Sequence, residues 1–361
     1  MTKQDFILSL VDSGLWQREM RHFDMSLHEY RAVMVEAEKQ CVLGLVIDCL
    51  MFNNMGLQKQ CVIHMMKYKN TLEMENKRLD ENVIALNNVL RENDIDYAVV
   101  KGQIIASLYP KPHMRVPGDI DFYVPNNHFK KAVEVLNEAW GLKLNGESKK
   151  MHQCFEYNAN EFEIHRFLKY FPNAKRQKQF NDIIDKYPYD QIMVNGVAIN
   201  TLNPTLNIFY TFVHLYGHFI KMGVALRQLC DMAVLLHHYH HQIDRGLLKE
   251  LLDQFGFMHA FNAIGSILVD KLGLPEDDFP WEIQAKDKKR GLKALNLIWK
   301  HGNWGKYDRS YDAQNKNLKY FWGKTYYRIS NHILFFQLSP KENLFMLFTE
   351  LPKKVLKKLS K

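Results

Sequence analysis

The distribution of proline and glycine divides this chain into parts with different folding tendencies. No proline occurs before Pro110, and glycine is rare in the first 92 residues. In the same region three segments carry apolar residues at spacings of three and four, the period of amphipathic helices: 5–16, 26–52 and 57–91. We therefore expect an N-terminal helical region over 1–92. Within it, residues from 76 onward are rich in charged and amide side chains, which predicts a solvent-exposed helix that becomes amphipathic towards Leu90.

The period changes between residues 93 and 203, where short strand-like segments alternate with helical ones. Tyr97-Ala98-Val99-Val100 is an apolar run typical of a buried strand, and residues 119–124 alternate between polar and apolar. The predicted strands are 97–100, 119–124, 141–146, 154–159 and 161–168, and the predicted helices are 103–110 and 127–139. Strand, helix, strand, helix and then further strands predict an α+β fold around a mixed sheet.

Helical periodicity returns after Pro204 and continues to the end of the chain. The clearest predicted helices are 205–222, 224–241, 247–272 and 286–300, and 301–318 is predicted to be a long loop. We expect the aromatic and lysine-rich C-terminal stretch to pack against the protein, with contact to an anionic membrane surface as the less favoured alternative. The predicted organisation is a mixed sheet with flanking helices over 93–203, between helical regions at 1–92 and 204–361.

The composition restricts the class of partner and the compartment. The 361 residues carry a net charge of +8, which favours anionic partners: nucleotides, nucleic acid or an acidic membrane surface. The five cysteines are odd in number and lack CxxC spacing, so we expect reduced thiols, with Cys154 in the core. We identify no secretory signal and no apolar run of about 18 residues, and therefore expect a cytoplasmic protein without a transmembrane segment.

The strand predicted at 119–124 carries two aspartates at alternate positions. Asp119 and Asp121 should project from one face while Ile120 and Phe122 pack on the other. Two neighbouring carboxylates repel each other unless a cation lies between them, and Mg²⁺ (or Mn²⁺) prefers such oxygen ligands. The pattern predicts a metal site, and it predicts that Asn at either position stabilises the metal-free protein. An edge strand with two solvated aspartates is the alternative interpretation.

A strand-to-helix turn upstream supplies the features of a phosphate-binding site. Lys101-Gly102 follows the predicted strand at 97–100 and precedes the helix that begins at Gln103. Glycine allows the backbone to approach a phosphate closely, and a helix N-terminus offers unpaired N–H groups. Lys101 adds a positive charge. Together with the aspartate pair, this turn predicts binding of a phosphorylated ligand.

A third carboxylate lies in the segment Glu161-Phe162-Glu163-Ile164-His165. Phe162 and Ile164 should face one way, while Glu161, Glu163 and His165 face the other. Glu163 is the preferred third metal ligand, because its apolar neighbours would bury the strand. Three such acids suit a two-metal site, in which one ion activates the attacking hydroxyl and the other holds the triphosphate. The alternative is a charged outer face of the strand.

These motifs together resemble the uncharacterised nucleotidyltransferase family of the DNA polymerase β superfamily. The resemblance rests on Lys101-Gly102, Leu108-Tyr109-Pro110, Arg115, Gly118-Asp119-Ile120-Asp121, Glu163-Ile164-His165, His214, His218 and the run Leu226–Ala233 with Arg227 and Asp231, and it covers roughly residues 95–240. It implies a nucleotidyltransferase-type mixed sheet, Mg²⁺ at the aspartate pair and a nucleoside triphosphate (NTP) at the turn. One departure is Gln103, which stands where the superfamily usually has serine.

The resemblance also extends the set of site residues. The residues implied to bind nucleotide are Lys101, Gly102, Gln103, Arg115 and Gly118, and those implied to line the cleft are His165, Arg227 and Asp231. Two of these assignments have structural alternatives. Arg115 can instead pair with a carboxylate that holds its loop, and Arg227 with Asp231 can form an i,i+4 pair on one helix.

The expected activity is Mg²⁺-dependent transfer of a nucleoside monophosphate from an NTP to the hydroxyl or phosphate of an unknown acceptor. In this scheme Asp119, Asp121 and Glu163 bind the metal and perform the catalytic role. The alternative is a catalytically inactive relative that binds nucleotide or another protein. Retention of the three acids favours the first, and the missing Gly-Ser turn favours the second.

Overall fold

The computed structural model describes residues 2–53, 55–142, 152–171, 173–303, 318–353 and 356. The chain forms two compact units. We call the unit made of 13–32 and 43–210 the sheet unit, and the unit made of 1–12, 33–42 and 211–361 the helical unit. The division of the sequence into three regions stays a prediction.

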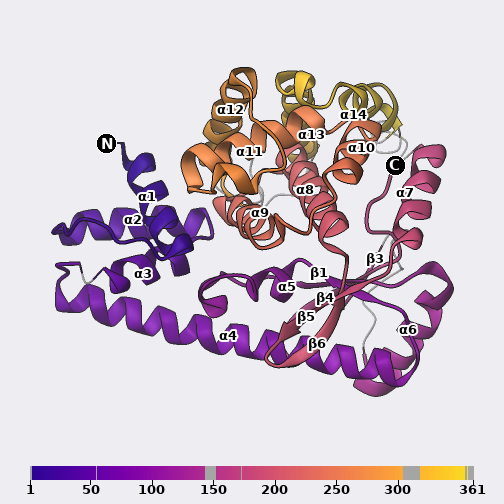
Figure 1. The fold of residues 1–361 in the computed structure, drawn as a ribbon, viewed down its shortest axis with the longest axis horizontal. Coiled ribbons are helices and arrows are strands. Elements are labelled where there is room, and N and C mark those ends of the chain that lie inside the picture. The colour runs from indigo at the N-terminus through magenta and orange to yellow at the C-terminus, as the bar shows by residue number, and fades with distance from the viewer. Residues whose placement is uncertain are drawn as a thin grey trace. The chain divides into compact units, whose positions relative to one another are not determined.

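The described elements, named as in Figure 1, are mostly helices. Up to residue 140 the helices are α1 (Lys3–Trp16), α2 (Leu27–Lys39), α3 (Leu43–Phe52), α4 (Lys59–Glu92), α5 (Gly102–Ala106), η1 (Pro112–Met114) and α6 (Asn126–Trp140). The later ones are α7 (Ala174–Lys186), α8 (Pro204–Lys221), α9 (Leu226–Tyr239), α10 (Arg245–Gln254), α11 (Met258–Leu272), η2 (Glu276–Asp278), α12 (Ala285–His301), α13 (Leu318–Leu334), η4 (Phe336–Leu338), α14 (Pro340–Phe345) and η5 (Met346–Glu350). The strands are β1 (Ala98–Val100), β2 (Ile120–Tyr123), β3 (His152–Tyr157), β4 (Asn160–His165), β5 (Asp190–Val194) and β6 (Val197–Thr201).

A four-stranded mixed sheet in the order β1-β2-β4-β3 organises the sheet unit. β2 runs antiparallel to β1 and parallel to β4, and β3 runs antiparallel to β4. β5 and β6 form a separate antiparallel hairpin. The predicted α+β fold with a mixed sheet and flanking helices is confirmed.

Helices α4 and α6 cover one face of this sheet, as Figure 1 shows. The core on this side contains Phe122 of β2, Phe162 and Ile164 of β4, Leu86 of α4 and Leu136 of α6. Alternation along each strand sends the intervening side chains to the opposite face. The core therefore determines which residues of β2 and β4 remain available for chemistry.

Helix α4 differs from its prediction as a solvent-exposed helix. Its buried residues include the polar side chains Asn76, Asp80, Asn82 and Asn87 among leucines and valines. Burial of these groups is possible because they are hydrogen-bonded; for example, Asn76 donates to the carbonyl of Arg115 at 3.1 Å. Although α4 is rich in charged and amide residues, one of its faces is buried and contacts the loop before β2.

Two predicted helices are each divided in the structure. Segment 26–52 breaks between α2 and α3 at Cys41, which has a φ of 53°, and 247–272 breaks between α10 and α11 at Gly256, with a φ of +71°. Backbone in this left-handed region cannot continue a right-handed helix. Helix α7 and the β5–β6 hairpin were not predicted. Most of the strand predicted at 141–146 and of the loop at 301–318 lies outside the described residues.

The helical unit contains α1 up to Asp12, α2 from Val33 onward, α8 from Thr211 onward and the helices α9 to α14. Helices α11 and α12 approach closely at Gly291, where an added Cβ would meet the side-chain oxygen of Ser266 at 2.1 Å. Among the helices described in either unit, none combines the length and apolar character that crossing a bilayer requires.

Candidate functional site

A row of polar side chains crosses the sheet on the face opposite the core. The register places Asp121 of β2 beside Glu163 of β4, and Glu163 beside Cys154 of β3. His165, two residues beyond Glu163, shares its face of β4. Lys101, which follows the last residue of β1, reaches Asp121 from the other side. This row brings side chains from separate parts of the sheet unit into one cluster.

The shortest contact in the cluster joins Lys101 to Asp121. Lys101 Nζ lies 2.6 Å from Asp121 Oδ2, and the two side chains are 13% and 3% exposed. Burial alone would raise the pKa of Asp121, but the Lys101 ammonium and the hydrogen bond from His165 hold it well below its usual value. Burial alone would lower the pKa of Lys101, yet the charge of the Asp121 carboxylate keeps it above the usual range. The ring of Tyr210 lies 5.9 Å from Lys101 Nζ. Both groups are therefore charged at neutral pH.

This pair bears on two predictions from the sequence. In the structure the Lys101 ammonium is paired with Asp121, and its contact with a phosphate stays a prediction. Asp121 was expected to suffer repulsion in the metal-free protein, whereas Oδ1 lies 2.7 Å from His165 Nε2 and Oδ2 contacts Lys101. A buried carboxylate with two such partners is stabilised rather than repelled.

Glu163 is the member of the cluster in the least favourable electrostatic environment. Its side chain is 23% exposed, and Oε2 lies 3.5 Å from His165 Nε2. Burial raises the pKa of Glu163, the neighbouring charge of Asp121 raises it further, and Asp119 adds to the shift. Asp119 itself is exposed and immediately precedes β2. Negative charge thus accumulates around Glu163, as expected where a cation binds.

The register separates the two glutamates of β4. Glu163 is paired with Asp121, while Glu161 is exposed and paired with Glu156 of β3. The structure thus places Glu163, and not Glu161, beside the aspartate.

The turn between β1 and α5 has an uncommon backbone conformation. Lys101 has φ 58° and ψ −142°, a region that costs a residue with a side chain about 1–3 kcal/mol. Gly102 also has a positive φ, +41°, and a Cβ there would lie 3.3 Å from the carbonyl oxygen of Asp119. The turn is therefore packed directly against the residue that precedes β2. Helix α5 ends at Ala106 instead of continuing to Pro110, so it has only five residues.

Substitution of Gly102 tests the close packing of this turn. We expect Gly102→Ala to lower the free energy of unfolding by about 1–2 kcal/mol for its positive φ, and by more for the contact with Asp119. Gly196→Ala is the matched control, since Gly196 has a φ of +79° and nothing within 4 Å of an added Cβ. Urea unfolding of the two variants should show the larger loss for Gly102→Ala. Equal losses would show that the contact with Asp119 contributes nothing.

Gln103 is directed away from the polar row. Its side chain is 4% exposed, and Nε2 donates to Asp80 Oδ1 on α4. Asp80 Oδ2 also contacts Asn195 Nδ2 at 3.0 Å and His113 Nε2 at 3.3 Å. This bond ties the turn to α4, and a contact of Gln103 with nucleotide stays a prediction.

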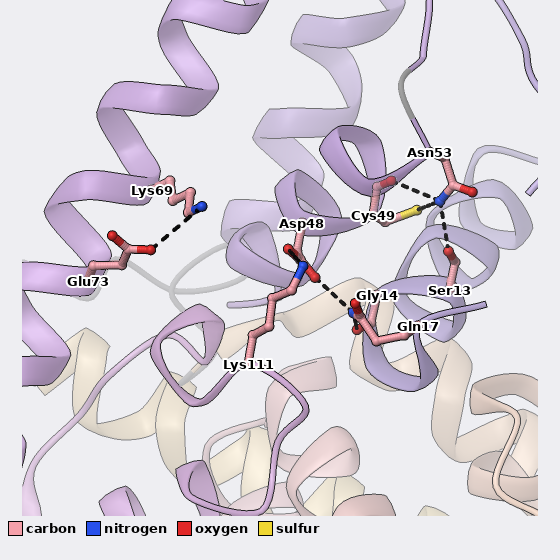
Figure 2. A network of polar contacts seen from close by, with 9 residues as sticks. All are labelled: Ser13, Gly14, Gln17, Asp48, Cys49, Asn53, Lys69, Glu73 and Lys111. Carbon is pink, nitrogen blue, oxygen red and sulfur yellow. Dashed lines mark hydrogen bonds and ion pairs between the residues drawn. The ribbon is translucent and has the colours of Figure 1, made fainter. Parts of the chain in front are cut away.

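The loop between α5 and β2 carries Arg115 and Gly118 and is held at several points. Figure 2 shows Lys111 directed at Asp48 of α3, with Nζ 2.6 Å from Oδ1, while Gln17 Nε2 donates to Oδ2 at 2.9 Å. Arg115 is 4% exposed, whereas Gly118 is exposed beside Asp119. The anchored loop determines where β2 begins and hence where Asp119 lies.

The remaining predicted residues belong to the helical unit. Arg227 and Asp231 lie on α9, where Asp231 is buried. Their assignment to a cleft stays a prediction.

The structure adds residues that the sequence analysis did not place at the site. Tyr210 is buried beside Lys101, and Asp80 secures Gln103. No motif identifies Tyr210; for Asp80, a signal is the recurrence of polar residues on the buried face of α4. Cys154 was predicted to lie in the core, but it is only half-buried, and its Sγ contacts Glu163 Oε1 at 3.5 Å. Alternation explains this: Phe155 faces the core, so Cys154 faces the polar row.

The donor set fits a divalent cation. Asp121, Glu163 and His165 each offer a ligand atom, and these atoms lie within 4.8 Å of one another. Carboxylate oxygens suit Mg²⁺ and Mn²⁺, and the charge gathered around Glu163 provides the attraction. Because Lys101 now compensates Asp121, a cation at that carboxylate has to compete with the ammonium.

Comparison with known proteins assigns the chain to a family. No curated protein matches it significantly. One solved structure that is similar to this chain is that of an antigenic nucleotidyltransferase-like protein from Paracoccidioides brasiliensis. The similarity covers 56% of this chain and 97% of the chain in that structure, with 12% sequence identity and a TM-score of 0.33. The family model described as uncharacterised nucleotidyltransferase matches residues 29–270, a span that contains every predicted site residue. Because that match extends over more than half of the chain, this protein belongs to the uncharacterised nucleotidyltransferase family.

Proposed function

We propose that the protein transfers a nucleoside monophosphate from an NTP to a hydroxyl or phosphate oxygen of an acceptor, with Mg²⁺ or Mn²⁺. The acceptor oxygen attacks the α-phosphorus, a new P–O bond forms, and the bond to the departing pyrophosphate breaks. The observation that supports this most is the convergence of Asp121, Glu163 and His165 on one sheet face beside Lys101. Family membership supports the reaction class.

The metal would be held by carboxylates of the polar row. Asp119 and Asp121 would provide the first ligands and Glu163 the third, since the charges of all three are coupled. When bound, the ion neutralises triphosphate charge and lowers the pKa of the acceptor hydroxyl. Lys101 and His165 keep Asp121 ionised, so its carboxylate is ready to coordinate at neutral pH. Lys101, once released from Asp121, is close enough to the same position to contact a phosphate.

Glu163 would help to hold the ion that activates the acceptor. Burial and the charge of Asp121 raise the pKa of its carboxyl, so a bound cation would relieve the repulsion between the two carboxylates. We therefore assign Glu163 to the ion that lowers the pKa of the acceptor hydroxyl, and Asp119 and Asp121 to binding of the metal and the triphosphate.

The turn at Lys101-Gly102 would accommodate the triphosphate. Gly102 has no side chain that would come between its backbone and a phosphate, and Lys101 adds charge next to it. The Gln103 side chain donates a hydrogen bond to Asp80 on α4, which holds the turn in place, and it has no hydroxyl that could bind phosphate. This last observation favours a second candidate function, nucleotide binding without transfer.

A thermal-shift panel of NTPs with and without Mg²⁺ tests the nucleotide site. We expect the wild type to melt at a higher temperature with Mg·NTP, because a ligand that binds the native state stabilises it. Asp119→Asn should abolish this shift, since it removes a proposed metal ligand. Asp96→Asn is the matched control: Asp96 is exposed and precedes β1 much as Asp119 precedes β2. An unchanged shift in Asp119→Asn would remove Asp119 from the metal site, and no transfer of radiolabelled nucleotide to any acceptor would favour the binding function.

A further inference from the structure

Strand β3 places a second group of metal-ligating side chains next to the polar row. His152 and Cys154 lie two residues apart and share a face of β3, and the register pairs Cys154 with Glu163 and His152 with His165. His152, Cys154 and Glu163 are all half-buried, so an ion in solution can reach them. The core on the other face is closed by Phe155, whose ring stacks on Phe162.

The spacing of these ligands is that of a metal site. One ligand atom from each of His152, Cys154 and Glu163 lies within 4.8 Å of the others. Cys154 Sγ and Glu163 Oε1 are 3.5 Å apart. Around a tetrahedral ion with Zn–S of about 2.3 Å and Zn–O of about 2.1 Å, two such atoms would be separated by roughly 3.6 Å. The two side chains therefore already have the separation that zinc coordination requires.

The chemistry of the ligands distinguishes this group from the one around Asp121. Imidazole and thiolate are the ligands of Zn²⁺ and similar ions, whereas Mg²⁺ prefers oxygen. We propose that His152, Cys154 and Glu163 bind one thiophilic divalent cation of the Zn²⁺ class, at a site that adjoins the proposed Mg²⁺ site and shares Glu163 with it. The proposal rests on these three residues and does not depend on nucleotidyl transfer.

One carboxylate oxygen of Glu163 is directed at Cys154 and the other at His165. Oε1 contacts Cys154 Sγ, and Oε2 lies 3.5 Å from His165 Nε2. A single carboxylate can thus contribute to both sites through different atoms. Three protein ligands leave the fourth tetrahedral position for water, as in zinc sites that exchange ligands. Binding converts the Cys154 thiol to thiolate and releases its proton, so the affinity rises with pH.

Titration of the full-length, reduced protein with Co²⁺ tests the site, because Co²⁺ replaces Zn²⁺ and bound thiolate gives it a near-ultraviolet charge-transfer absorption. We expect one equivalent of Co²⁺ to produce this absorption in full, and Zn²⁺ then to abolish it. Cys154→Ser should lose the band. His152→Gln should weaken Co²⁺ binding at least about tenfold, the minimum expected for a lost ligand.

Matched variants separate this site from other causes of the signal. Cys41→Ser removes the other half-buried cysteine and should retain the band. Asp121→Asn should retain it as well, even if it eliminates nucleotide binding, so the two proposals fail separately. The proposal is overturned if the wild type gives no thiolate band, or if the band survives Cys154→Ser. It is also overturned if His152→Gln binds Co²⁺ as tightly as the wild type, a result that stands even where Cys154→Ser does not fold.

Discussion

Asp121→Asn is expected to destabilise the metal-free protein by about 3 kcal/mol, because it leaves the Lys101 ammonium buried without its counter-charge. The Lys101 side chain is only 13% exposed, so water cannot replace the lost carboxylate fully. Asn retains the shape of the side chain and can still accept a hydrogen bond from His165. The change therefore isolates the charge of Asp121.

A double-mutant cycle with Lys101→Met measures the pair. Lys101→Met alone leaves the Asp121 carboxylate in contact with His165 but without the ammonium, and the double variant removes both charges. We expect the double variant to be more stable than the sum of the single losses predicts, as is usual for residues in direct contact. Urea unfolding of the metal-free chain gives the four values. If Asp121→Asn raises stability, the repulsion inferred from the sequence outweighs the ion pair.

Glu163→Gln is expected to lower nucleotidyl transfer by about 100-fold or more, while Mg·NTP binding changes by only a few-fold. Asp119 and Asp121 remain to hold the metal and triphosphate, whereas the lost carboxylate acts mainly in the transition state. Single-turnover rates with radiolabelled NTP and separate binding titrations distinguish the two effects. Glu161→Gln is the matched control, since Glu161 is exposed on the same strand, two positions away. If Glu161→Gln removes activity and Glu163→Gln does not, the assignment of the catalytic role to Glu163 is wrong.

Glu163→Gln is also expected to stabilise the metal-free protein, although it lowers activity. The pKa of Glu163 is raised in the folded protein, so the ionised carboxylate opposes folding at pH values above the pKa of Glu in the unfolded chain. Glu163→Gln should therefore raise the melting temperature of the metal-free protein at neutral pH. The gain should vanish as the pH falls below about 4.3, the pKa of Glu in an unfolded chain, because the carboxyl is then protonated in both states. A loss of stability at neutral pH would show that His165 and Cys154 stabilise the carboxylate more than burial and Asp121 oppose it.

Alternation along short strands made much of the site predictable. Asp121 lies between two core residues, Ile120 and Phe122, and Glu163 lies between Phe162 and Ile164. In a strand this pattern permits only one orientation for the carboxylates, whatever the rest of the chain does. The D-x-D strand, the E-x-H strand and the turn between β1 and α5 could therefore be identified from local sequence.

The sequence by itself determined the mixed sheet, the face of each strand that carries acids, and the family to which the motifs point. Only the tertiary structure decided which groups compensate those acids. Lys101 is paired with Asp121, Gln103 with Asp80, and Cys154 with Glu163, through contacts between side chains of different elements of the fold. Periodicity reports whether a side chain faces the core or the opposite side. It does not report the register between strands, and in the low-dielectric interior a partner a few ångströms away determines the charge and availability of each group.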